Sequence, residues 1–179
     1  MIYNISFLNH CSPTTSYQPP ATNSRGFTLI ELLVVVVILG ILASVGLGQF
    51  YTAQKRGRDA QRKENLSSLK KALEMYYNDY GSYPESQEGK IKVNDSQINW
   101  GDEFSDGKTI YMKQLPQDPA GNLQYFYESD GSYFKLYAFL EHSEDQDVGG
   151  PYDSTDCDAS EETTRKCNYC LASPNARCE

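Results

Sequence analysis

The chain has 179 residues, a net charge of −8 and a mean hydropathy of −0.59. This length allows one globular domain with a hydrophobic core and some attached segments, but hardly two domains. The acidic balance argues against nucleic acid as the main partner, because no net positive field attracts a polyanion, and only a local basic strip would contact DNA.

The first 26 residues are rich in Ser, Thr, Asn and Pro and show no periodicity. They contain one basic residue, Arg25, and no acidic residue, so the rest of the chain is one unit more negative than the whole. A segment of this kind is typical of a leader peptide rather than of a folded element.

Residues 27–50 read FTLIELLVVVVILGILASVGLGQF and contain a single charged residue, Glu31. A helix of this length extends about 36 Å, which is enough to cross a hydrocarbon layer of about 30 Å. A buried core helix, the alternative, would be shorter and flanked by more apolar sequence. We therefore expect this segment to insert into a membrane.

An amphipathic stretch follows. Its apolar and aromatic residues recur at a 3-4-3-4 spacing, at Leu66, Leu69, Leu73, Tyr76 and Tyr80. This spacing places them on one stripe of a helix and predicts that the helix continues over residues 51–80 and lies on its own domain. A coiled coil is the alternative, but the run covers only about two heptads. The opposite face is expected to be solvated: Lys63, Glu64, Lys70, Lys71, Glu74 and Asn78.

The helix is expected to end at Gly81 and Pro84. Residues 85–122 contain several glycines and prolines, and we expect little regular structure there. The aromatic-rich runs 123–128 and 133–140 flank an Asp-Gly turn, which predicts an antiparallel hairpin. The expected fold class is thus α+β, with a long N-terminal helix whose second half packs on a small antiparallel sheet.

The chain has five cysteines. Cys11 lies in the leader, and the other four fall in a tail that is poor in apolar residues, 157–179: Cys157, Cys167, Cys170 and Cys178. An even, clustered set predicts disulfides that stabilise this tail, with three pairings open. Cys167-x-x-Cys170 also resembles half of a zinc site or a redox pair, although the sequence has no second CxxC and no nearby histidine. Disulfides would place the C-terminal part outside the cytoplasm.

The segment Arg25-Gly26-Phe27-Thr28-Leu29-Ile30-Glu31, followed by the apolar run, resembles the class III signal of bacterial type IV pilins and type II secretion pseudopilins. The resemblance implies that a prepilin peptidase cleaves after Gly26 and methylates the new N-terminal Phe27. It also implies that Glu31 pairs with the N-terminal ammonium of a neighbouring subunit during assembly. A carboxylate in lipid costs a few kcal/mol unless it is neutralised or paired, so the residue type suits this role. A position at headgroup depth, with no role, is the alternative.

Residues 66–77, the Gly-Ser-Tyr-Pro turn at 81–84 and the hairpin are similar to those of the major pseudopilins. Many members of that group bind calcium in a loop after the last hairpin strand. Here the candidate oxygen ligands are Glu144, Asp145, Asp147, Asp153, Asp156 and Asp158. Because Asp145-Gln146-Asp147-Val148-Gly149 lacks the EF-hand spacing, a solvated acidic loop is the favoured interpretation. We therefore expect no cofactor and no metal, with calcium as the one candidate.

Five basic residues follow the apolar run, whereas only Arg25 precedes it: Lys55, Arg56, Arg58, Arg62 and Lys63. The positive-inside rule alone would leave the large domain in the cytoplasm, against both the cysteines and the topology that the resemblance implies. We give more weight to the latter two. The basic cluster is then expected to meet acidic surfaces of neighbouring subunits, anionic headgroups or DNA.

Catalysis is not expected. Outside the leader the chain has one histidine, His142, and the sequence contains no nucleophile–base set and no phosphate-binding loop. We predict a structural subunit of a type IV pilus-like filament, built from a leader (1–26), a transmembrane and assembly helix (27–50) and a periplasmic or extracellular domain (51–179). It would sit in the inner membrane before assembly and in an extracellular or periplasmic filament afterwards.

The implied partners are other copies of the chain, minor pilins, the prepilin peptidase, membrane lipid and an inner-membrane assembly platform with a cytoplasmic ATPase. No small-molecule substrate and no DNA partner is indicated. Three alternatives stay open: a pseudopilin of a type II secretion or DNA-uptake system, an uncleaved single-pass anchor that displays a binding domain, and a secreted hydrolase cut after Ala43 or Ser44.

Overall fold

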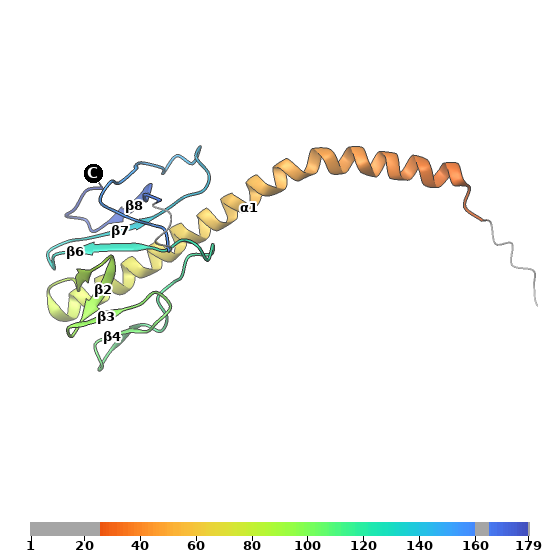
Figure 1. Ribbon diagram of the computed structural model, residues 1–179. Helices are drawn as coiled ribbons and strands as arrows, with labels where there is room; N and C mark the ends of the chain where they lie inside the picture. The colour runs from red at the N-terminus through yellow and green to blue at the C-terminus, as the bar shows by residue number, and fades with distance from the viewer. Residues whose placement is uncertain (1–25, 160–164, 179) are drawn as a thin grey trace, which may run out of the picture. The chain divides into compact units, whose positions relative to one another are not determined.

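The computed structural model describes residues 26–159 and 165–178, apart from the side chains of residues 45–48. The expected leader therefore lies outside the described residues except for Gly26. The chain divides into two compact units, Met1–Ala43 and Ser44–Glu179, and each is described by itself. Helix α1, Leu29–Tyr80, contributes to both units (Figure 1).

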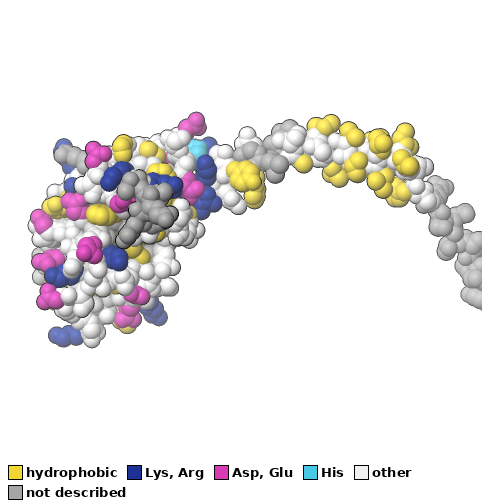
Figure 2. All heavy atoms as spheres, viewed as in Figure 1, with side chains coloured by type: hydrophobic (Ala, Val, Ile, Leu, Met, Phe, Trp, Pro, Cys, Tyr) yellow, Lys and Arg dark blue, Asp and Glu magenta, His cyan; other side chains and the backbone are white. Residues whose placement is uncertain are grey.

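The described part of the first unit is residues 26–43, which contain the apolar beginning of α1. Its large side chains are exposed, from 47% for Val34 to 83% for Phe27 and Leu29, and Figure 2 shows them at the surface. Among the described residues, no single unbent helix has the length and the hydropathy expected of a membrane span. The stretches Leu29–Ser44 and Gln49–Tyr80 qualify only when taken together as a bent pair, on length and composition.

In the second unit, α1 buries the stripe that the sequence periodicity predicts. Leu66, Leu69 and Leu73 are fully buried, whereas Tyr80 is 50% exposed and stacks on Tyr76 with ring centroids 4.5 Å apart. The helix ends at Tyr80, because the next residue, Gly81, takes a positive φ of 71° that favours glycine. Gly81 also donates its N–H to the Tyr77 carbonyl at 2.8 Å, which closes the last turn.

The expectation of little regular structure in residues 85–122 is wrong. This part of the chain forms five short strands: β1 Glu85–Gln87, β2 Lys90–Val93, β3 Ser96–Ile98, β4 Phe104–Ser105 and β5 Ile110–Met112. Ile91 and Val93 are buried while their neighbours Lys90 and Lys92 are not, which is the alternation of a half-buried strand. β1, β2 and β3 form one antiparallel sheet, and β4 pairs with β5.

The predicted hairpin is present, with β6 at Phe126–Ser129 and β7 at Phe134–Ala138. Tyr127 pairs with Leu136 in its antiparallel register. The Asp130 carboxylate accepts the Ser132 N–H at 2.9 Å and so fixes the turn. An unpredicted strand, β8 Tyr169–Ala172, pairs with β7 and extends this sheet to the order β6-β7-β8.

The core of the second unit lies between α1 and these sheets. The buried leucines of α1 form one cluster with residues of all three sheets, including Ile91, Phe104, Tyr127, Phe134 and Leu136. Figure 1 shows β6 drawn across the C-terminal half of α1, with β7 beside β6. The fold class is therefore α+β, as predicted, with more strands than the sequence indicated.

Candidate functional site

The N-terminal segment begins with a capping arrangement. The carboxylate of Glu31 accepts hydrogen bonds from the Thr28 backbone N–H and from the Thr28 hydroxyl, both at 2.8 Å. The Glu31 N–H in turn donates to the Thr28 hydroxyl at 3.3 Å. This reciprocal pair is a capping box, which satisfies free N–H groups at the start of a helix. Thr28-x-x-Glu31 is readable in the sequence as this motif, although it was not predicted.

The residues around the expected cleavage point are open. Phe27 is 83% exposed. A Cβ atom added to Gly26 would have no atom within 4 Å, apart from those of the two residues adjacent to Gly26 in the chain. Phe27, Ile30, Val34 and Val35 line an apolar hollow that also includes Glu31. The first described turns thus combine an accessible Gly–Phe bond, an apolar surface and one carboxylate at the positive end of the helix dipole.

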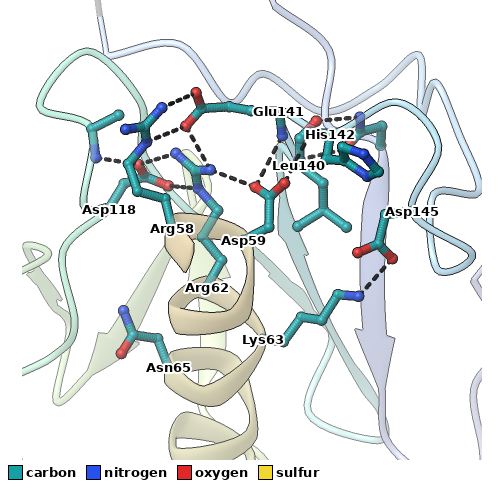
Figure 3. A network of polar contacts seen from close by, with 12 residues as sticks. Arg58, Asp59, Arg62, Lys63, Asn65, Asp118, Leu140, Glu141, His142 and Asp145 are labelled. Atoms are coloured by element: carbon teal, nitrogen blue, oxygen red, sulfur yellow. Dashed lines mark hydrogen bonds and ion pairs between the residues drawn. The ribbon is translucent and has the colours of Figure 1, made fainter. Parts of the chain in front are cut away.

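In the second unit, α1 carries a buried ionic network centred on Arg62 (Figure 3). The Arg62 side chain is 0% exposed. It donates to both carboxylate oxygens of Asp118 at 2.8 Å, and its Nη1 lies 2.7 Å from Asp59 and 2.8 Å from Glu141. A guanidinium with several carboxylate partners is the arrangement in which a buried arginine is stable.

Asp59 and Arg58 connect this network to the chain after β7. Asp59 accepts the backbone N–H groups of Glu141 at 3.0 Å and His142 at 2.9 Å. Arg58 donates two hydrogen bonds to Glu141, at 2.7 and 2.5 Å. The Arg58 bonds lower the pKa of Glu141 to about 2, helped by Arg62 and opposed by partial burial. The network therefore joins α1, the loop at Asp118 and the segment after β7.

Lys63 makes a second connection one turn away. Its ammonium lies 2.6 Å from a carboxylate oxygen of Asp145 and 2.6 Å from one of Asp147. Partial burial alone would lower the pKa of Lys63, but the two carboxylates outweigh it and raise the pKa above its usual value. Lys63 was expected on a solvated face, but the acidic loop covers most of it and leaves its side chain 26% exposed.

The structure also corrects the expected role of the basic cluster. Arg58, Arg62 and Lys63 pair with carboxylates of the same chain rather than facing other subunits, headgroups or DNA. Lys55 and Arg56 are exposed, and Arg56 contacts His142 at 3.3–3.4 Å. A charge count along the sequence therefore overstates the positive charge beside the apolar run, since three of these five cations are neutralised internally.

Calcium does not fit the side chains of the acidic loop as they are arranged. Calcium takes six to eight oxygen ligands at 2.3–2.6 Å. Asp145 and Asp147 already hold the ammonium of Lys63, which would have to leave for a cation to reach the same oxygens. Within residues 26–159 and 165–178, no three His, Cys, Asp or Glu side chains are grouped to hold a metal ion.

The tail contains two disulfide bonds, as predicted. Of the three open pairings, the structure has Cys157–Cys167 and Cys170–Cys178. Cys157 and Cys167 are buried beside Tyr137 of β7, while Cys170 lies within β8 and pairs with Tyr137 in the register. The tail is therefore attached to the sheet as well as cross-linked. The fifth cysteine, Cys11, lies outside the described residues.

Two protein families match the chain. The family described as "Type II secretion system (T2SS), protein G" matches residues 49–159, and the "Prokaryotic N-terminal methylation motif" matches residues 21–47. The first match covers more than half of the chain and most of the second unit. The second spans Gly26, Phe27, Glu31 and most of the apolar run.

Curated proteins named "Type II secretion system core protein G" are similar over most of their own length. The one from Pseudomonas aeruginosa is 38% identical over 120 residues, which is 63% of this chain and 80% of that protein. The one from Aeromonas hydrophila is 33% identical over 129 residues (69% and 90%), and that from Vibrio cholerae 34% over 125 residues (69% and 84%). No solved structure matches the chain.

Proposed function

The chain belongs to the type II secretion system protein G family, and on that premise we propose that it is the repeating subunit of a type II secretion pseudopilus. The observation that carries this proposal is that one chain joins an exposed apolar helical segment to a folded α+β domain. We call this domain, the second unit of the chain, the head. Apolar side chains that the chain itself leaves uncovered require lipid or other subunits around them.

We propose that the chain is made as a precursor and is cleaved after Gly26. The exposed Gly26–Phe27 bond and the match of the methylation motif over residues 21–47 support this step. Glycine lets the backbone extend into a protease cleft without side-chain clashes. The new N-terminus, Phe27, would then be methylated by the prepilin peptidase.

Residues 27–50 would hold the processed chain in the inner membrane and afterwards pack with the same segment of other copies. In this proposal Glu31 exchanges partners during assembly. Before assembly the capping box with Thr28 satisfies the carboxylate, and on assembly the N-terminal ammonium of a neighbouring subunit offers a charged partner. A charge-assisted bond to an ammonium is stronger than one to a neutral hydroxyl, which favours the exchange in lipid.

The head would form the outer surface of a periplasmic filament, where an oxidising compartment preserves both disulfides. Other copies of the chain, minor pseudopilins and an inner-membrane assembly platform are the partners that this function requires. We assign no reaction to the head, because its one described histidine, His142, is hydrogen-bonded by Arg56 and its buried charges serve the ionic network.

The test is deletion of the gene followed by complementation with the intact gene and with a Glu31→Val variant. We expect the deletion to abolish release of the proteins that the secretion system exports, the intact gene to restore it and the variant to fail. Twitching and DNA uptake are scored in the same strains. Normal export with loss of twitching or DNA uptake would overturn the secretion assignment.

A further inference from the structure

The loop after β7 is anchored to α1 by consecutive helical turns. Asp59 binds the backbone of Glu141 and His142 where the loop begins, and Lys63, four residues further along α1, binds its middle. At the far end, the Gly149 N–H donates to the Asn168 carbonyl at 2.9 Å. The loop from 141 to 149 is thus held at its start, its middle and its far end, and its middle is held by the ammonium of Lys63.

The ammonium of Lys63 occupies the position between the two loop carboxylates. One oxygen of Asp145 and one of Asp147 each lie 2.6 Å from the same nitrogen. Two carboxylates brought this close repel each other unless a positive charge lies between them. The Asp145 carboxylate also accepts the Asp147 N–H at 3.0 Å, so the loop backbone and the ion pairs share one geometry.

The rest of the environment suits an organic cation. The ring of Tyr169 on β8 lies 5.8 Å from the Lys63 nitrogen, which is within the range of a cation–π contact. The four-carbon stem of Lys63 reaches the loop from α1, and its side chain is 26% exposed. A divalent ion at the same oxygens would face the ammonium at close range, and the two cations would repel each other.

We propose that Lys63 is the built-in cation of the 141–149 loop, so that this loop keeps its conformation without a divalent metal ion. A loop that bound calcium at these carboxylates would instead be held by an ion taken from solution. In this chain the positive charge belongs to α1 and is present whenever the head is folded. The inference concerns the head alone and does not depend on the proposed secretion function.

The test uses the full chain in detergent and follows thermal unfolding by circular dichroism. We expect the midpoint of the wild-type chain to be the same in CaCl2 and in EGTA. Lys63→Met removes both ion pairs and should lower the midpoint by about 2–6 °C. Lys71→Met is the matched control, since Lys71 is an exposed lysine of the same helix, and it should leave the midpoint unchanged. A lower wild-type midpoint in EGTA, or equal midpoints for the two variants, would overturn the proposal.

A second measurement covers the case in which Lys63→Met does not fold. Terbium bound at Asp145 and Asp147 would lie near Tyr169, whose ring can sensitise its emission. We expect the wild-type chain to show no saturable sensitised emission. Saturable emission that CaCl2 displaces would show that a metal ion reaches the loop despite Lys63 and would refute the proposal.

Discussion

Replacement of Arg62 by Met is the most demanding test of the ionic network. The guanidinium is completely buried and binds three carboxylates, of which Asp59 and Asp118 are each 1% exposed. Methionine fills much of the volume of the arginine side chain but leaves these carboxylates without their cation. Removing one partner of a buried ion pair typically costs about 3–5 kcal/mol, because the remaining charge has lost its compensation in a region of low dielectric. For a domain of this size that cost corresponds to a drop of about 6–20 °C in the unfolding midpoint.

The assay is urea and thermal denaturation of the full chain in detergent, followed by circular dichroism, with Arg58→Met as the matched control. Arg58 also binds Glu141, but its side chain is 29% exposed, so water can replace much of the interaction. We expect Arg62→Met to be strongly destabilised and Arg58→Met to be destabilised much less. Equal, small effects of the two substitutions would show that the buried network does not stabilise the head, and would refute the reasoning.

Three further predictions follow from the same contacts. Because the pKa of Glu141 is lowered from 4.5 to about 2, its contribution to stability is complete above about pH 4.5 and is lost as the pH falls towards 2. The urea midpoint should therefore fall over this range less steeply in Glu141→Gln than in the wild type, and identical slopes would contradict the assignment. Cys157→Ser with Cys167→Ser opens a loop of ten residues and should cost about 2–3 kcal/mol in urea denaturation, whereas an unchanged free energy of unfolding would show that this disulfide does not stabilise the tail. Glu31→Val should be processed normally but recovered in filaments at a much lower yield, and a normal yield would exclude the pairing role.

Local periodicity was enough to predict the parts of the fold that depend on neighbouring residues. The spacing of Leu66, Leu69 and Leu73 identified the buried face of α1, and the aromatic runs around Asp130-Gly131 identified the hairpin of β6 and β7. In both cases one face of a regular element must be buried, so the pattern of side chains carries the signal.

The strands that were missed are short or lie in unusual sequence. β2 has four residues, and its alternation of Lys90, Ile91, Lys92 and Val93 is too brief to stand out between two turns. β8 lies among cysteines, and its pairing with β7 depends on contacts across more than thirty residues. Strands of this kind are fixed by the sheet that they join rather than by their own propensity.

The N-terminal motif and the ionic network differed in how far the sequence predicts them. Gly26, Phe27 and Glu31 lie within six consecutive residues and are readable as a motif, and the capping box of Thr28 was readable too. The ionic network was not, because it unites residues of α1 with carboxylates at 118, 141, 145 and 147, whose proximity is decided by the fold. A weak signal existed, since the charged residues Asp59 and Arg62 continue the 3-4 spacing of the buried leucines of α1 towards its N-terminus.

The proposed function depends most directly on the cleavage that turns Phe27 into the N-terminus of an assembly helix. The decisive measurement is mass spectrometry of the chain purified from the membrane and filament fractions of cells with and without the prepilin peptidase. The prediction is a chain that begins at N-methylated Phe27 when the peptidase is present, and a precursor that retains Gly26 and the residues before it when the peptidase is absent. An identical, uncleaved N-terminus in both strains, or a chain cut after Ala43 or Ser44, would contradict it.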